Sequence, residues 1–214
     1  MRVDSKVRAR RVRAACVFSV SRRHPRSTPH HLCRCVEGLE RHPPGQPEEQ
    51  VTSTLAVAGQ TVPAVGEHAP DFELVNQFGE PVRLSSFRGQ NVVLVFYPFA
   101  FSGVCTGELC EIRDNLTAFE DARATVLAVS VDSKFSLRAY AEKESYGFDL
   151  LADFWPHGAV ASAYGVFDPE NGMAGRGTFI IDATGTIRYV VVNPRGQARE
   201  LADYQDALAG LEQS

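Results

Sequence analysis

Residues 91–110 read NVVLVFYPFAFSGVCTGELC, and this segment joins an almost continuous apolar run to a stretch with helical spacing. A short, uninterrupted apolar run is typical of a strand that is covered on both faces. Pro98 ends that strand, and a helix is expected from about Val104 to Asp121. Cys105 then falls in the first turn of the helix, directly after a buried strand.

From residue 65 onward, strand patterns alternate with helix patterns. Hairpins are predicted in PDFELVNQFGEPVRLSSFRG (70–89) and GTFIIDATGTIRYVVV (177–192), and further strands in ATVLAVSVD (124–132) and FDLLAD (148–153). Three more helices are predicted: one capped by Ser133 and running to about Tyr146, one in HGAVASAYG (157–165) and one from Arg199 to Leu211. This order predicts one α/β domain at residues 61–214, with a central mixed β-sheet flanked by helices.

Residues 1–60 differ in composition from the rest of the chain, because they are rich in arginine and proline and lack a sustained period. Residues 1–50 hold eleven Arg and Lys against five Asp and Glu, a balance of +6, whereas the remainder has a balance of −10. We expect residues 1–60 to form a disordered basic extension. An arginine-rich start also fits an organelle transit peptide, and AACVFSV (14–20) is barely long enough for the core of a secretory signal.

Charge and hydropathy argue against several classes of partner. Duplex DNA and anionic membranes need a dense cationic face, which the acidic body lacks, so no nucleic acid is expected to bind. The longest apolar run, Val92–Phe101, has about half of the roughly 20 residues that a spanning helix needs. The cluster HHLCRC (30–35) offers metal-ligand residue types without the usual C-x₂-C spacing, so no metal site is expected.

The position of Cys105 favours a reactive thiolate. Free backbone N–H groups and the positive end of the helix dipole both stabilise a negative sulfur in a first turn. Ser102 lies three residues earlier, so its hydroxyl can face the sulfur and also donate to an oxygen of a substrate. Pro98 has no N–H, and Phe99 and Phe101 flank it closely enough to shield the sulfur from bulk water. We therefore expect a small apolar-walled pocket at Cys105.

The pattern P-x-x-x-[S/T]-x-x-C, filled here by Pro98, Ser102 and Cys105, resembles the peroxidatic motif of peroxiredoxins. The resemblance continues in APDFEL (69–74), LADFWPHGAVASAYGVF (151–167) and RGTFIIDATGTIRY (176–189), and it covers about residues 62–214. It is closest to the AhpE and PrxQ (bacterioferritin-comigratory) branches. The resemblance implies a thioredoxin-like fold and a thiol peroxidase that reduces hydrogen peroxide, organic hydroperoxides or peroxynitrite.

The resemblance also implies a role for individual residues. Cys105 matches the peroxidatic cysteine, Ser102 the hydroxyl position and Pro98 the shielding proline. Arg176 matches the arginine that fixes the thiolate and polarises the peroxide, a role that suits a rigid, permanently charged guanidinium. Glu108 is implied to orient Arg176. The expected product at Cys105 is a sulfenic acid, and no metal, haem, flavin or other cofactor is needed.

Cys110 has more than one interpretation. It lies about 140° around the predicted helix from a core stripe formed by Leu109, Ile112, Leu116 and Phe119. The resemblance to the PrxQ branch implies a resolving cysteine that forms an intramolecular disulfide with Cys105. A structural cysteine and a one-cysteine cycle resolved by an external thiol remain alternatives. On an intact helix the two Cα atoms would be roughly 8.6 Å apart, beyond the roughly 7 Å limit for a disulfide, so the first turns must unwind.

Two rival functions make different demands on the sequence. A thiol–disulfide oxidoreductase on the same fold would need C-x-x-C, whereas this chain has C-x-x-x-x-C. A non-catalytic redox sensor or chaperone would leave the motif around Cys105 unexplained. The expected partners are a peroxide substrate, a thioredoxin-like or low-molecular-weight thiol reductant and possible second copies in a homodimer. The expected location is the cytoplasm, with organelle targeting as the alternative.

Overall fold

The computed structural model describes residues 61–211 of the 214-residue chain. The predicted basic extension at residues 1–60, including the HHLCRC cluster, lies outside the described residues. Within residues 61–211, the longest helix has 12 residues, and no helix could cross a membrane.

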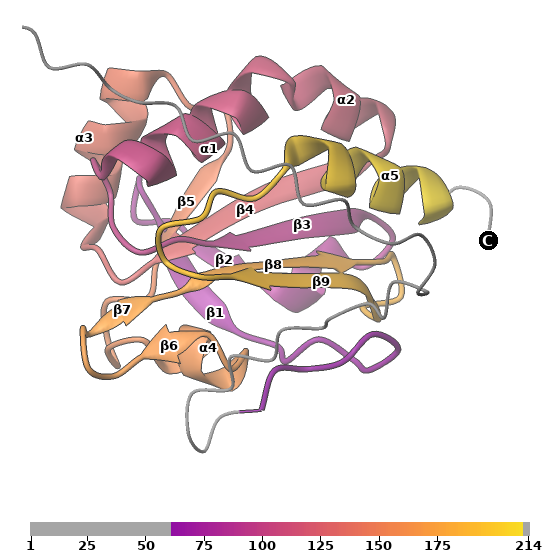
Figure 1. Cartoon of the computed structure of the whole chain (residues 1–214), viewed down its shortest axis with the longest axis horizontal. Helices are drawn as coiled ribbons and strands as arrows, with labels where there is room; N and C mark the ends of the chain where they lie inside the picture. Colours follow the sequence, from indigo (N-terminus) through magenta and orange to yellow (C-terminus); the bar gives the residue numbers. More distant parts are fainter. Residues whose placement is uncertain (1–60, 212–214) are drawn as a thin grey trace, which may run out of the picture. The chain divides into compact units, whose positions relative to one another are not determined.

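A seven-stranded sheet forms the centre of the described domain (Figure 1). In sheet order its strands are β2 (Pro81–Arg83), β1 (Glu73–Asn76), β5 (Asp149–Ala152), β4 (Ala124–Ser130), β3 (Asn91–Phe96), β8 (Arg176–Ile181) and β9 (Ile187–Asn193). The three central strands β5, β4 and β3 are parallel, and all the other pairings are antiparallel. The predicted mixed sheet, with its two hairpins, is confirmed.

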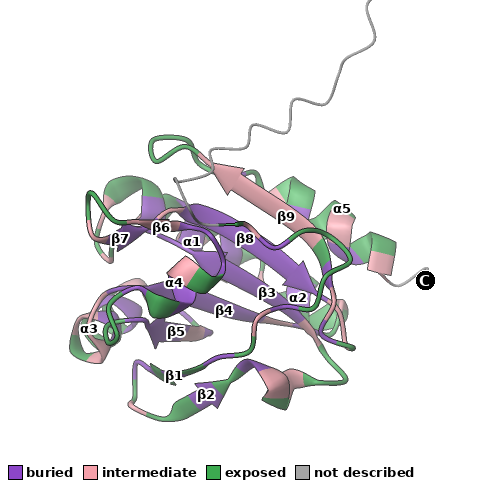
Figure 2. Cartoon of the chain, turned by 90° about the horizontal axis from the view of Figure 1, so that it is seen from below, coloured by how far each residue is buried: buried purple, intermediate pink, exposed green. Residues whose placement is uncertain are grey.

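Alternate residues of β3 enter two different hydrophobic cores. Val93 and Val95 pack under the helices α1 (Gly103–Asp114), α2 (Leu116–Asp121), α3 (Lys134–Glu144) and α5 (Leu201–Leu211). Leu94 and Phe96 pack on the opposite face, which is covered by α4 (Ala159–Ala163). The remaining elements are the 3₁₀ helix η1 (Leu84–Phe87) and a small hairpin of β6 (Phe167–Asp168) and β7 (Met173–Ala174). Because both faces are covered, β3, β4 and β8 are almost wholly buried (Figure 2).

The helix predicted over Val104–Asp121 is two helices in the structure, so that prediction is wrong in one detail. The break falls at Asn115, whose backbone has φ −118° and ψ 19°. The Asn115 side chain donates to the carbonyl oxygen of Glu111 at 2.9 Å. Asparagine offers the backbone an alternative hydrogen bond in this way, which explains why it interrupts the helix.

The start of α3 and the end of α5 lie where the sequence predicted them. Ser133 caps α3, since its Oγ accepts the backbone N–H of Ser136 at 3.3 Å. The last helix begins at Leu201 rather than at Arg199. Just before this helix, the backbone N–H of Arg199 donates to the carboxylate of Glu108 at 2.8 Å. This contact brings the start of α5 to the functional site.

Candidate active site

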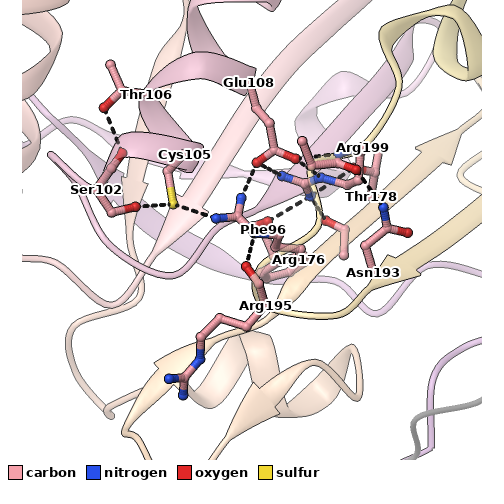
Figure 3. Close-up of polar contacts among 12 residues, drawn as sticks. Phe96, Ser102, Cys105, Thr106, Glu108, Arg176, Thr178, Asn193, Arg195 and Arg199 are labelled. Carbon is pink, nitrogen blue, oxygen red and sulfur yellow. Dashed lines mark hydrogen bonds and ion pairs between the residues drawn. The ribbon is translucent and has the colours of Figure 1, made fainter. Parts of the chain in front are cut away.

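Cys105 lies in the first turn of α1, which β3 positions at the edge of the larger core. Its side chain is fully buried, and the hydroxyl of Ser102 donates to its sulfur at 2.6 Å (Figure 3). Ser102 is the residue that precedes α1, so its extended backbone turns the hydroxyl toward the first turn. Pro98 is buried in the connection between β3 and α1. The local sequence thus brings a hydroxyl to a thiol at a helix N-terminus.

The second group on the sulfur is the guanidinium of Arg176, at the start of β8. Its Nη2 donates to Sγ of Cys105 at 3.4 Å, and only 2% of the residue is exposed. Its Nη1 donates to Glu108 Oε2, and its Nε donates to the carbonyl oxygen of Arg195 at 2.6 Å. Every nitrogen of this guanidinium therefore has a partner, which fixes its orientation toward the sulfur.

Arg199 is a member of this site that the sequence did not reveal. Its Nε donates to Glu108 Oε1 at 3.0 Å, and its Nη2 donates to Oε2 at 3.1 Å. Its Nη1 donates to the carbonyl oxygens of Phe96 at 2.8 Å and Gly177 at 2.9 Å. The only sequence signal was an arginine at a helix start, which usually is a solvated residue. Its burial depends on α1 and α5 meeting over the sheet.

The charges in the buried site balance only when Cys105 is ionised. Arg176 and Arg199 each carry a positive charge, and Glu108 carries one negative charge between them. With a neutral thiol the group has one positive charge in excess, whereas a thiolate makes it neutral. Burying an uncompensated charge is costly, and the buried neighbours of Cys105 would compensate a negative charge on its sulfur.

The sulfur is more enclosed than the sequence suggested. Phe99 and Phe101 are 40% and 49% exposed, but Cys105 itself has no exposed surface. Phe101 packs on the ring of Tyr140, with 4.8 Å between ring centroids. The sulfur is therefore shielded from water in this conformation, and the small apolar-walled pocket at Cys105 stays a prediction.

Cys110 lies on the same helix, one and a half turns after Cys105. Both are free thiols, and α1 is continuous between them. Cys110 is partly buried, and its sulfur lies 3.9 Å from the hydroxyl of Tyr146. In this state the two sulfurs cannot bond without local unwinding.

Comparisons with known proteins identify the family. The model of the AhpC/TSA family matches residues 65–190. The alkyl hydroperoxide reductase E of Mycobacterium tuberculosis is 46% identical over 148 residues, which is 69% of this chain and 97% of that protein. Peroxiredoxin Bcp of Escherichia coli is 38% identical over 131 residues, covering 58% of this chain and 83% of the relative.

Solved structures agree with the sequence comparisons. The peroxidoxin BcpB of Mycobacterium tuberculosis superposes with a TM-score of 0.61 at 33% identity, covering 70% of this chain and 96% of that one. The reduced 2-Cys peroxiredoxin of Plasmodium vivax superposes with a TM-score of 0.64 at 27% identity, covering 71% and 83% of the two chains. The predicted resemblance is confirmed: this chain belongs to the AhpC/TSA family and is a peroxiredoxin.

Proposed function

We propose that this peroxiredoxin reduces hydroperoxides with the sulfur of Cys105, and that Cys110 then resolves the oxidised sulfur as an intramolecular disulfide. The observation that carries the first step is the pair of donors on one buried sulfur, Ser102 Oγ at 2.6 Å and Arg176 Nη2 at 3.4 Å. Both donors occupy fixed positions before a substrate arrives, so little reorganisation is needed during the reaction.

The first step is a displacement at the oxygen–oxygen bond. The Cys105 thiolate attacks the terminal peroxide oxygen, an S–O bond forms and the O–O bond breaks. The bonding electron pair leaves on the other oxygen, which takes up a proton and departs as water or an alcohol. Ser102 and Arg176 stabilise the negative charge that develops on the oxygens, and each donor of this kind contributes about a hundredfold or more in rate. Cys105 is left as a sulfenic acid.

Glu108 and Arg199 act on this step indirectly. Glu108 holds the Nη1 of Arg176, and Arg199 holds both oxygens of Glu108. They are positioning residues, because neither contacts the sulfur. Their effect is to keep the Nη2 of Arg176 aimed at Cys105.

In the second step the sulfur of Cys110 attacks the sulfur of the Cys105 sulfenic acid. An S–S bond forms, the S–O bond breaks, and hydroxide leaves with the thiol proton of Cys110 as water. A thioredoxin-like or low-molecular-weight thiol then reduces the disulfide. The presence of a partly exposed cysteine five residues away on the same short helix supports this step.

A one-cysteine cycle is the second candidate, and the intact α1 helix favours it. In that cycle an external thiol attacks the Cys105 sulfenic acid directly, and Cys110 stays reduced. Intact-mass measurement after one equivalent of hydroperoxide separates the two cycles. An intramolecular disulfide loses two hydrogens relative to the reduced chain, whereas a persistent sulfenic acid gains one oxygen.

The proposal also covers the cellular location and the oligomeric state of the enzyme. A cytoplasmic location suits the proposed cycle, because a reducing compartment supplies the thiols that return the oxidised protein to its reduced form. A homodimer is supported by two large apolar side chains on the surface, Phe154 at 54% and Trp155 at 82% exposure. Sedimentation of the reduced protein at several concentrations tests this assembly, and a monomer at all concentrations would contradict it.

A further inference from the structure

Helix α1 has a second, half-buried face, whose side chains contact α3 and the segment that directly follows it. Its contacts recur at spacings of four and three residues along one side of the helix. The contact pairs are Thr106 with Tyr140, Cys110 with Tyr146, and Arg113 with the carbonyl oxygen of Glu144. Cys110 therefore lies between two contacts of α1 with α3, one near the peroxidatic turn and another farther along α1.

The first contact ties down the turn that carries Cys105. Both the backbone N–H and the hydroxyl of Thr106 donate to the carbonyl oxygen of Ser102, each at 2.9 Å. The single hydroxyl proton of Thr106 is used in that bond. In its 2.9 Å contact with Tyr140, the tyrosine hydroxyl must therefore be the donor. Tyr140 thus holds Thr106, and Thr106 holds Ser102.

Tyr140 is well placed to hold this turn rigidly. Its side chain is fully buried, with the Phe101 ring at 4.8 Å and the Tyr146 ring at 5.1 Å between centroids. Burial raises the pKa of Tyr140, so its hydroxyl stays protonated and able to donate at neutral pH. The Tyr146 ring in turn stacks on Phe148 with 5.2 Å between centroids. Two packed tyrosines therefore contact this segment of α1: Tyr140 contacts Thr106 near its start, and Tyr146 contacts Cys110 at its end.

We propose that Tyr140, acting through Thr106, is a positioning residue that keeps the first turn of α1 wound. It thereby sets the rate at which the Cys105 sulfenic acid forms a disulfide with Cys110. This inference rests on the proposed resolving role of Cys110. Disulfide formation requires that turn to unwind, and unwinding breaks the Tyr140–Thr106 and Thr106–Ser102 hydrogen bonds. While the turn stays wound, a second peroxide can transfer an oxygen atom to the sulfenic sulfur, giving sulfinic acid and water or an alcohol. The strength of the contact therefore sets the partition between disulfide and sulfinic acid.

The test removes the hydroxyl of Tyr140 and keeps its ring. In Tyr140→Phe the loss of the neutral hydrogen bond to Thr106 should favour the unwound turn about fivefold. After rapid mixing with excess hydroperoxide and quenching, intact-mass measurement should give disulfide about fivefold faster and a correspondingly smaller sulfinic acid fraction. The rate of the first oxidation should stay within about twofold of wild type, because the wound turn remains the major state. Hydrogen exchange of the Thr106 amide in the reduced protein should also accelerate about fivefold.

Two further variants make the test specific. Thr106→Val removes the contact with Tyr140 and also the hydroxyl hydrogen bond to Ser102, so it should shift the partition in the same direction and at least as strongly. Adding Tyr140→Phe to it should change nothing more. Tyr164→Phe is the matched control, because the Tyr164 hydroxyl also makes one hydrogen bond, to the carbonyl oxygen of Pro70 at 2.8 Å, in the core on the opposite face of the sheet. It should leave the partition at the wild-type value.

The outcomes separate this inference from the proposed function. If wild type forms the disulfide but Tyr140→Phe and Thr106→Val partition as wild type does, the role of Tyr140 is overturned and the resolving role of Cys110 stands. If Tyr164→Phe shifts the partition as strongly as Tyr140→Phe, general destabilisation is the cause, and the role of Tyr140 is again overturned. If wild type forms no disulfide at all, both the resolving role and the inference built on it are overturned.

Discussion

Arg199 and Glu108 are 91 residues apart in the chain, yet three hydrogen bonds join Arg199 to the Glu108 carboxylate in the buried site. Glu108 in turn holds Arg176, whose guanidinium faces the sulfur of Cys105. The sulfur is thus oriented by a chain of charged groups drawn from α1, β8 and the segment before α5. This arrangement explains how a short helix can present a thiolate that is both buried and electrically balanced.

Loss of Arg199 should destabilise the whole domain. Arg199→Ala leaves part of the Glu108 charge unpaired and removes a donor from the backbone carbonyls of Phe96 and Gly177, which should cost about 3–5 kcal/mol in the free energy of unfolding. Denaturant unfolding measures this quantity. The control is Arg195→Ala, since the Arg195 side chain is 55% exposed in its ion pair with Asp168 and should cost about 1 kcal/mol or less. Equal losses in the two variants would show that the buried pair carries no special stability.

Loss of the Arg176 guanidinium should slow the first oxidation rather than the resolution. Arg176→Met removes a donor to the sulfur and the charge that balances the thiolate, so peroxide attack at neutral pH should fall about a hundredfold or more. Arg176→Lys keeps the charge but loses the guanidinium fork, so its rate should fall between those of wild type and Arg176→Met. Rapid-quench mass measurement provides the rates, and a rate near that of wild type in Arg176→Met would contradict this role.

Cys110→Ser should separate the two steps of the cycle. The first oxidation should proceed at about the wild-type rate, because α1 and the donors on Cys105 are intact. Steady-state turnover with a thioredoxin-type reductant should fall about tenfold or more, since the sulfenic acid has no internal partner. Unchanged turnover would instead support the one-cysteine cycle.

The sequence predicted features that depend on neighbouring residues better than features that depend on contacts between distant segments of the chain. The strand at Asn91–Phe96 and the helix start before Cys105 have strong local patterns, and both lie where they were predicted. The helix break at Asn115 also had a local signal, in a residue type that competes for backbone hydrogen bonds, but the apolar spacing on both sides outweighed it.

The partners of Arg199 and Cys110 could not be read from the sequence. The contact between Arg199 and Glu108 exists only once α1 and α5 pack on the same face of the sheet. The helical angle of Cys110 predicted a position away from the core stripe, whereas in the structure Cys110 is partly buried and packs against the same core. Nothing local indicated that Tyr146 would lie against it. The full burial of Cys105 results from the same packing of distant segments.

Asp182 should make a contribution to stability that disappears in acid. Partial burial alone would raise the pKa of Asp182, but hydrogen bonds from Thr184, Thr186 and Arg188 outweigh it and lower the pKa from 3.8 to about 2. Since the folded-state pKa is the lower one, the contribution is fully present above the unfolded pKa and is lost as the pH falls through about 2.

The size of this contribution follows from the shift. A difference of nearly two pKa units corresponds to about 2 kcal/mol. Denaturant unfolding should therefore show Asp182→Ala less stable than wild type by about that amount near neutral pH, with the gap closing as the pH is lowered toward about 2. A gap that stays constant over this range would assign the effect to packing instead of ionisation.

The central claim is that peroxide oxidises Cys105 and that Cys110 captures the product. Peptide mapping by mass spectrometry after a single equivalent of hydroperoxide tests it most directly, with wild type and Cys110→Ser treated in parallel. The expected result is a disulfide joining Cys105 and Cys110 in wild type, and in Cys110→Ser a sulfenic acid at Cys105 that dimedone traps. A wild-type protein in which Cys105 stays reduced while the peroxide remains unconsumed would contradict the claim.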